Sequence, residues 1–318
     1  MRLAFASATP FVLVLSIHAQ TMRAHIAMEE RSGVPIVQVS VNGTGPYPFV
    51  LDTGANVTVI NQRLLRSLNI PWAGSVTIAA SLGDSSQQRT ESATLGIAGQ
   101  SVEHVEINTL QEGQLGALEG HVQGILGENF LKYFDLLIDN DHHALTLDRT
   151  PNLANSVEGE HLPLARTGTY HSVATPDRIV VPLRLALLAR PVSLLLDSGT
   201  NTAMLFPAQQ EAAQIAWSSG HGNIHSLNAS QNCHVERTNL AIGSQTLRNV
   251  VLAACEGRTR DKTDTDGLLP TGIFHRLFIS HQREYVIANP HPVERAGRKE
   301  PEKGSADMRA AGASIDLE

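Results

Sequence analysis

Two similar tripeptides, each at the end of a short apolar run, constrain this chain more than any other feature. Asp52-Thr53-Gly54 follows Phe49-Val50-Leu51, and Asp197-Ser198-Gly199 follows Leu194-Leu195-Leu196. Each apolar run predicts a buried strand, and an ionisable carboxylate at the end of a buried strand is costly unless the protein uses it. We therefore expect the two halves of the chain to build one site together.

The two tripeptides belong to a longer similarity that keeps one register. Asp52 and Asp197 are 145 positions apart, and this spacing holds without a gap from about residue 46 to residue 105. Further along it shifts by two, so that residues 124–127 align with residues 267–270. One long similarity of this kind is typical of an internal duplication rather than of a short repeating array. The matching pairs include Pro46 and Pro191, Leu51 and Leu196, Leu95 and Leu240, Ile97 and Ile242, Gln100 and Gln245, and Val105 and Val250.

Short runs with β-branched residues, separated by turn signals, predict an all-β fold with a few short helices. Asn42-Gly43 is a hairpin signal that leads into the strand before Asp52. Asn61 is expected to cap a short helix that carries Leu64 and Leu68 on one face. A chain of 318 residues has room for two lobes of ordinary domain size. We expect an N-terminal lobe at residues 33–150, a turn-rich linker at 151–177 and a C-terminal lobe at 178–290.

The two segments around the tripeptides, together with Gly124-Ile125-Leu126-Gly127, resemble the retropepsin-like aspartic proteases. The resemblance covers residues 33–290 and is to the bacterial secreted type, which has both lobes fused in one chain. It implies a bilobal acid protease fold, pepsin-like or retropepsin-like, formed by internal duplication. One departure is Pro270, which stands where the family has Gly. Because proline fixes φ and lacks a backbone donor, the support beneath Asp197 is expected to differ in detail.

The resemblance implies that Asp52 and Asp197 form the catalytic dyad of an aspartic protease. Two carboxylates that share one proton supply both the base that activates water and the acid that protonates the leaving amine. Gly54 and Gly199 permit a tight turn and a close approach of the backbone. The hydroxyls of Thr53 and Ser198 resemble those that bond across the lobes, with a local turn bond as the alternative. No metal and no cofactor are implied.

Two functions follow for a chain of this kind. The first is an aspartic endopeptidase that hydrolyses extended peptides or proteins between the lobes. The alternative is a catalytically inactive peptide-binding module of the same fold, in which Asp52 and Asp197 serve only as capping or turn residues. The two intact tripeptides favour the enzyme, and Pro270 favours the alternative. Because each lobe supplies one Asp, the site needs no second copy of the chain, and we expect a monomer.

A hairpin with a polar tip is expected within residues 75–107. Its tip contains Gly83, Asp84 and Ser85, which makes it the candidate flap over the first lobe. The position after the first strand and helix favours this interpretation, since loops on a rigid scaffold commonly carry function. An ordinary solvent-exposed hairpin is the alternative.

Composition narrows the class of partner. The net charge is −7 and there is no basic cluster outside the tail, which argues against nucleic acid as a ligand. Hydrophobic residues make up 42% and charged residues 17%, so a packed core is expected and global disorder is not. The charged, Gly- and Ala-rich residues 291–318 show no periodicity and predict a disordered tail.

The N-terminus resembles a secretory signal peptide over residues 1–20. Arg2 provides the positive charge, a mostly apolar stretch follows to Ile17, and Ala19 precedes an imperfect cleavage site. The stretch is too short to span a bilayer comfortably, although an uncleaved signal anchor remains the alternative. We therefore expect a periplasmic or secreted protein with no other contact with the membrane.

Two further groups of residues in the second half leave alternatives open. Cys233 and Cys255 lie near the ends of a stretch that predicts two strands around Gly243-Ser244, and they either pair or remain buried thiols. His221 and His225, together with Cys233 and His234, form a candidate zinc cluster. Gly222 argues against the helix that would align the two histidines, so a solvated loop is the preferred interpretation.

Overall fold

The computed structural model describes residues 23–80, 83–111, 113–115, 118, 120–164, 169–170, 173–174, 178–207, 215, 221–225, 230–255 and 265–293. The expected signal peptide lies outside these residues, as does the expected tail beyond residue 293. Within the described residues, no helix combines the length and the apolar character needed to cross a membrane.

Strands make up most of the structure, and the all-β bilobal fold is confirmed. One sheet is built from the first half of the chain, in the order β6-β7-β10-β5-β11-β4-β3-β8-β9, with β2 paired to β3. Its strands are β2 (Glu29–Arg31), β3 (Val34–Val41), β4 (Thr44–Leu51), β5 (Thr58–Asn61), β6 (Trp72–Ala80), β7 (Gly83–Thr90), β8 (Ala93–Ile97), β9 (Gln100–Val105), β10 (Ile107–Leu110) and β11 (Gly124–Leu126).

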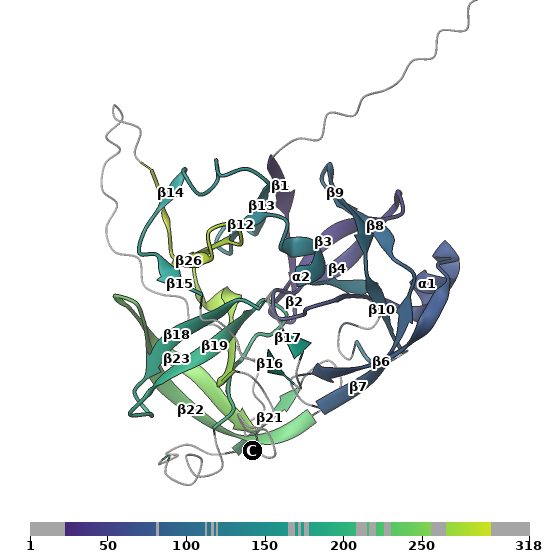
Figure 1. Ribbon diagram of the computed structural model, residues 1–318. Helices are drawn as coiled ribbons and strands as arrows, with labels where there is room; N and C mark the ends of the chain where they lie inside the picture. The colour runs from purple at the N-terminus through teal and green to yellow at the C-terminus, as the bar shows by residue number, and fades with distance from the viewer. Residues whose placement is uncertain are drawn as a thin grey trace, which may run out of the picture.

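A second sheet comes from the second half of the chain, in the order β18-β19-β24-β20-β23-β22-β21. An additional pairing between β18 and β22 brings the sheet back on itself. Figure 1 shows this sheet in green, on the other side of the molecule from the purple and blue first sheet. Its strands are β18 (Val180–Leu185), β19 (Pro191–Asp197), β20 (Ala203–Leu205), β21 (His221–His225), β22 (Ser230–Ile242), β23 (Gln245–Cys255) and β24 (Gly267–Pro270).

A third sheet of six strands joins the two halves, in the order β1-β13-β12-β25-β26-β15. Its centre is the antiparallel pair of β12 and β25, in which Leu136 lies opposite Ile279. β1, β12 and β13 precede residue 151, where the expected linker begins, and β15, β25 and β26 follow it. The two lobes therefore cannot separate without breaking this sheet. The strands are β1 (Arg23–Ala27), β12 (Asp135–Asp139), β13 (Ala144–Asp148), β15 (Leu162–Pro163), β25 (Arg276–Ser280) and β26 (Tyr285–Ala288).

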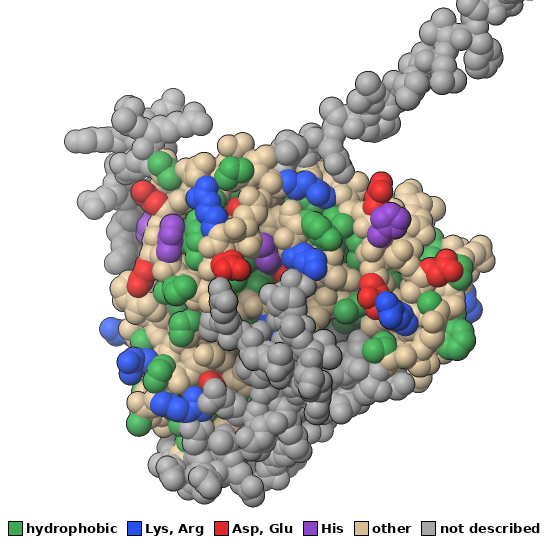
Figure 2. All heavy atoms as spheres, viewed as in Figure 1, with side chains coloured by type: hydrophobic (Ala, Val, Ile, Leu, Met, Phe, Trp, Pro, Cys, Tyr) green, Lys and Arg blue, Asp and Glu red, His purple; other side chains and the backbone are tan. Residues whose placement is uncertain are grey.

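Two short pairs complete the strands. They are β14 (Val157–Glu158) with β27 (His291–Pro292), and β16 (Thr169–Tyr170) with β17 (Val173–Ala174). Parts of the expected linker therefore form strands. Figure 2 shows acidic and basic side chains interspersed over the described part of one face, so the charge there is of mixed sign.

The strands of the two halves correspond in order and in pairing. β4 and β19, which end at the two tripeptides, each pair in parallel with a strand from the aligned Gly124 or Gly267 segment. In those pairs Val50 lies opposite Ile125, and Leu195 lies opposite Leu268. β5 and β20 then pair antiparallel to β11 and β24. The halves thus share one topology, while their origin by duplication remains a prediction.

Helices are few and short. α1 (Gln62–Leu68) begins after Asn61, whose side-chain oxygen accepts a 2.8 Å bond from the N–H of Leu64, as the capping pattern predicts. α2 (Glu128–Leu131) follows β11, and the 3-10 helix η3 (Thr271–Ile273) follows β24. Because α2 and η3 occupy corresponding places after the two parallel pairs, their difference bears directly on the site.

Two expectations for the second half are settled by β21 to β23. Cys233 is disulfide-bonded, and the chain's other cysteine, Cys255, is its register partner on the adjacent strand. The solvated loop expected around His221 and His225 is wrong, because this segment forms β21 and pairs with β22 from His221 opposite His234. The loop was expected because Gly222 argues against a helix, but glycine does not prevent an extended strand.

Candidate active site

The ends of β4 and β19 bring Asp52 and Asp197 together. A Cβ atom placed on Gly54 would lie 2.5 Å from Cγ of Asp197, and one on Gly199 would lie 2.5 Å from Cγ of Asp52. Each carboxyl group therefore packs directly on the glycine of the other loop, and the two carboxyl groups are linked by a hydrogen bond. Neither glycine has a positive φ. What requires glycine at both positions is space.

A reciprocal set of hydrogen bonds joins the two tripeptides. The backbone N–H of Thr53 donates to Oγ of Ser198 at 3.0 Å, and the N–H of Ser198 donates to Oγ1 of Thr53 at 3.1 Å. The Thr53 hydroxyl donates to the carbonyl of Leu196 at 2.9 Å, and the Ser198 hydroxyl donates to that of Leu51 at 2.7 Å. Both hydroxyls bond across the lobes rather than within a local turn, so each lobe fixes the other's loop.

The backbone bonds to the two carboxylates differ. Oδ1 of Asp52 accepts bonds from the N–H groups of Gly54 at 2.8 Å and Ala55 at 2.9 Å. Among the described residues, Oδ1 of Asp197 accepts one such bond, from Gly199 at 2.8 Å. Backbone donors stabilise an ionised carboxylate. Asp52 is therefore the better anion of the pair.

The electrostatics point the same way. Burial raises the pKa of Asp52, while the N–H groups of Gly54 and Ala55 oppose the rise. Burial and then the charge of Asp52 raise the pKa of Asp197 well above its usual range, against the opposing effects of the Gly199 N–H and the Arg178 charge. The two groups titrate as a pair. In the singly protonated state, the proton is favoured on Asp197.

Apolar side chains explain why burial dominates. Asp52 directly follows β4, and Asp197 is the last residue of β19. Because side chains alternate along a strand, Val50 and Leu195, two residues earlier, are expected on the same side of the chain as the two carboxyl groups. Val50 packs in an apolar cluster with Val59 and Ile125. The corresponding cluster in the second half contains Leu195, Met204 and Leu268. Such surroundings disfavour the charged form of a carboxyl group.

A short helix, α2, supports Asp52 by hydrogen-bonding to the loop that begins at this residue. We call residues 52–56 the Asp52 loop and residues 197–201 the Asp197 loop. The N–H of Glu128, the first residue of α2, donates to the carbonyl of Ala55 at 2.7 Å. Gly127 lies so close that a Cβ there would be 2.7 Å from the same carbonyl oxygen. The helix can approach the loop only because residue 127 is glycine.

An amide network adds to this support. Oδ1 of Asn129 accepts bonds from the N–H and the hydroxyl of Thr58, at 2.9 and 2.8 Å. The N–H of Asn129 donates to the carbonyl of Asn56 at 3.1 Å, and the N–H of Gly127 donates to the Thr58 hydroxyl at 3.1 Å. The Asp52 loop, β5 and α2 are therefore bonded into one unit.

The support beneath Asp197 lacks this network within the described residues. Pro270 is in register with Asp197 and leads into the 3-10 helix η3 instead of an α-helix. The positions that align with Thr58 and Asn129 are Ala203 and Gly272, which have no polar side-chain atoms. A Cβ on Gly272 would meet nothing within 4 Å. The departure noted at Pro270 thus coincides with a looser support.

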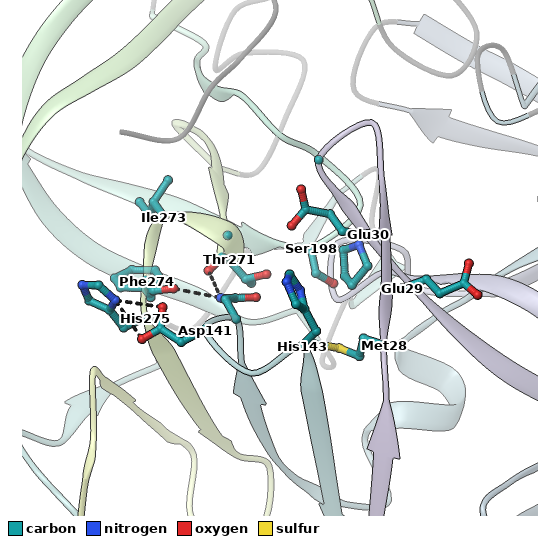
Figure 3. A pocket seen from close by; sticks show the side chains of 14 residues that line it. Met28, Glu29, Glu30, Asp141, His143, Ser198, Thr271, Ile273, Phe274 and His275 are labelled. Carbon is teal, nitrogen blue, oxygen red and sulfur yellow. Dashed lines mark hydrogen bonds and ion pairs between the residues drawn. The ribbon is translucent and has the colours of Figure 1, made fainter. Parts of the chain in front are cut away.

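A pocket occupies the space beside this looser support. Figure 3 shows Thr271, Ile273 and Phe274 on one side of it, and Glu30 and His143 on the other, with Ser198 between them. Neither Asp52 nor Asp197 lines it. The pocket therefore lies beside the inter-lobe bonds rather than at the carboxyl groups.

The candidate flap residues lie at the start of β7. Gly83 pairs with Ala80 and Asp84 with Ala79, in the β6–β7 hairpin that the polar tip predicts. The role of Gly83, Asp84 and Ser85 as a flap remains a prediction. Residues 81–82 lie outside the described part.

The β21–β22 hairpin is a feature that the sequence reasoning missed. β6 spans residues 72–80, and 145 positions later lie residues 217–225, which contain β21. Each lobe thus carries a hairpin at the same place in its topology, and Figure 1 shows both extending toward the lower side of the view. The signal was available in the shared 145-residue spacing.

In the candidate zinc cluster, the side chains of His221 and His225 lie outside the described part of the structure. Cys233 is disulfide-bonded and so cannot serve as a thiolate ligand. Across the described residues, no group of three or more His, Cys, Asp or Glu side chains could hold a metal ion.

Comparison with known families gives a match in the first half of the chain. The family described as gag-polyprotein putative aspartyl protease matches residues 37–133. The matched segment contains Asp52-Thr53-Gly54 and the Gly124–Leu126 strand with its Gly127. No curated protein matches the chain.

Proposed function

Because residues 37–133 place this chain in the retropepsin-like aspartic protease family, we propose that it is an aspartic endopeptidase whose Asp52 and Asp197 together activate a water molecule. The observation that carries the proposal is the mutual packing of each carboxyl group on the glycine of the opposite loop. Two buried carboxyl groups in contact are costly, and such pairs occur where one shared proton is needed.

The differences between the two aspartates assign their roles. Asp52, with two backbone donors, is the anion that removes a proton from the water as its oxygen attacks the peptide carbonyl carbon. Asp197, which holds the shared proton, donates it to the carbonyl oxygen. The resulting diol collapses as the C–N bond breaks. The amine nitrogen then takes the proton held by Asp52, and Asp197 recovers a proton from a diol hydroxyl.

The inter-lobe bonds keep this geometry fixed. Thr53 and Ser198 are each 1% exposed, and their hydroxyl groups donate to backbone carbonyls of the opposite half. A site built on rigid strand ends needs little reorganisation during the reaction. The substrate class that fits is an extended peptide or an unfolded protein. The enzyme would act on it as a monomer, in the periplasm or outside the cell.

The inactive peptide-binding module remains the second candidate, favoured by Pro270 and the looser support beneath Asp197. If that support were too loose to hold Asp197, the chain would bind peptides without cleaving them.

Digestion of an unfolded protein between about pH 3 and about pH 7, with and without a statine-type inhibitor, tests the proposal. We expect inhibitor-sensitive internal cleavage by the wild type and none by Asp52→Asn or Asp197→Asn. Asp266→Asn is the matched control, since Asp266 is also a buried carboxylate of the second half but bonds to Arg190 and Ser193. Peptide binding without cleavage by the wild type would favour the inactive module.

A further inference from the structure

A buried ion pair connects the two halves of the chain close to the Asp52 loop. Nε2 of His281 lies 2.8 Å from Oε2 of Glu128, and the two side chains are 10% and 0% exposed. Nδ1 of His281 lies 2.7 Å from the carbonyl oxygen of Phe134. An imidazole has two donors only when it is protonated, and both ring nitrogens here face acceptors. The geometry therefore fits a charged His281.

The pair leads to Asp52 in three hydrogen-bonded steps. His281 bonds to the side chain of Glu128, and the backbone N–H of Glu128 donates to the carbonyl of Ala55. The N–H of Ala55 then donates to Oδ1 of Asp52. Since Glu128 is the first residue of α2, a shift of its side chain moves the end of the helix that holds the loop.

The position that corresponds to His281 in the other half carries a neutral amide. β12 and β25 align at a spacing of 141, which carries Asn140 to His281. Nδ2 of Asn140 donates to the carbonyls of Thr271 and Phe274, both at 2.9 Å. A neutral amide thus holds η3 where an ion pair holds α2. The ionisable pair on that side, His275 and Asp141, lies next to η3 rather than in this place, with Nδ1 of His275 3.0 Å from Oδ1 of Asp141.

We propose that His281 is a positioning residue for Asp52, which in its charged form fixes Glu128 and through it the Asp52 loop, so that loss of its charge slackens the site. The proposal rests on the proposed endopeptidase activity. It adds a control of that activity by a residue from the other half of the chain, which touches neither the aspartates nor the substrate.

Two carboxyl groups near His281, Glu128 on α2 and Asp135 on β12, favour a protonated ring. Arg283, in the turn that carries His281 itself, interacts with Asp135 and, as a positive charge, does not favour protonation. Burial alone lowers the pKa of His281, but the Glu128 charge and the bonds to Glu128 and Phe134 outweigh it, so the pKa is raised above 6.5. The pair is therefore intact at pH below the raised pKa and is lost as pH rises through it.

The test compares wild type, His281→Gln, Glu128→Gln and the double variant Glu128→Gln/His281→Gln, in which two neutral amides can still bond. His142→Gln is the matched control, because His142 also contacts a carboxylate, Asp139, but is 72% exposed. For each we measure kcat and KM against pH, well below the unfolding temperature. In the same samples, NMR follows the imidazole signals of His281 and the backbone amide signals of Glu128 and Ala55.

We expect His281→Gln to lower kcat about tenfold to hundredfold with KM within about twofold of wild type. The double variant should recover most of kcat. In wild type the amide signals of Glu128 and Ala55 should shift with the titration of His281, and in the double variant that shift should be absent. His142→Gln should behave as wild type.

Single variants that lose thermal stability but keep kcat would overturn the proposal, since the pair would then be only structural. So would amide signals of the Asp52 loop that ignore the His281 titration. If wild type cleaves no substrate, the proposed function fails, and the NMR titration alone then decides whether His281 is coupled to the loop.

Discussion

Beneath Asp52, a short α-helix and an amide network hold the loop, whereas beneath Asp197 a proline and a 3-10 helix take the same place. The strands that deliver the two aspartates pair in the same way, so topology does not explain the difference. It arises from single residues: Gly127 admits close contact, while Pro270 has no N–H to donate. Two halves with one topology can therefore place their carboxyl groups in different hydrogen-bonded surroundings.

The comparison of the Asp52 and Asp197 sides assumes that the two aspartates act as a unit, and this assumption can be tested first. We expect Asp52→Asn and Asp197→Asn each to reduce kcat by about a thousandfold or more, and the double variant to be little worse than either. The measurement is single-turnover cleavage of an unfolded protein. Substantial turnover by either single variant would show that one carboxylate suffices.

The two glycines should be equally intolerant, because their contacts are reciprocal. Gly54→Ala would press on Asp197, and Gly199→Ala on Asp52, each with a Cβ 2.5 Å from a carboxyl carbon. We expect kcat to fall about a hundredfold in both variants, because the new methyl group would displace a reacting carboxyl group from its position. Near-normal activity in one of the two would mean that its loop relaxes more freely than the other.

The supports themselves can be compared with a pair of aligned positions. Asn129→Ala removes the acceptor of two Thr58 bonds, and we expect it to lower the free energy of unfolding by about 2 kcal/mol. Gly272→Ala adds a methyl group where nothing lies within 4 Å, so its effect should be within about 0.5 kcal/mol. Denaturant unfolding measures both. Equal changes in the free energy of unfolding would show that the two supports do not differ in strength.

The smallest effect concerns stability against pH. A carboxyl group whose pKa is raised on folding contributes stability at low pH, and this is lost as pH rises through the folded pKa. The pKa of Asp197 is raised well above its usual range, so Asp197→Asn should raise Tm at neutral pH and change little in acid. Asp52→Asn should gain less, since it also weakens two N–H bonds. A lower Tm at neutral pH in Asp197→Asn would contradict the assignment of roles.

Local sequence patterns predicted most of the fold. The apolar runs before the tripeptides form β4 and β19, and Asn61 caps α1, because strand burial and helix capping depend on neighbouring residues. The strand at His221–His225 escaped prediction because its pairing with β22 depends on the hairpin as a whole rather than on its own polar residues. The shared spacing, more than the composition of the segment, was the better guide there.

For the site, the sequence pointed to the residues but not to their inequality. Nothing in the two tripeptides indicates that Asp52 accepts two backbone bonds and Asp197 one. Pro270 did indicate where the halves would differ, because its missing donor is a property of the residue itself. The ion pair of His281 and Glu128 joins residues 153 positions apart, and no local pattern relates them.

The pH dependence of kcat/KM for the wild type, with and without EDTA, tests the central claim most directly. A carboxyl pair works only while singly protonated, so the rate should rise and then fall as pH climbs through two apparent pKa values. The upper limb should lie above the ordinary range of an aspartate, because burial and the Asp52 charge raise the pKa of Asp197, and EDTA should leave the profile unchanged. A rate that rises steadily to alkaline pH, or that vanishes with EDTA, would contradict the assignment of catalysis to Asp52 and Asp197.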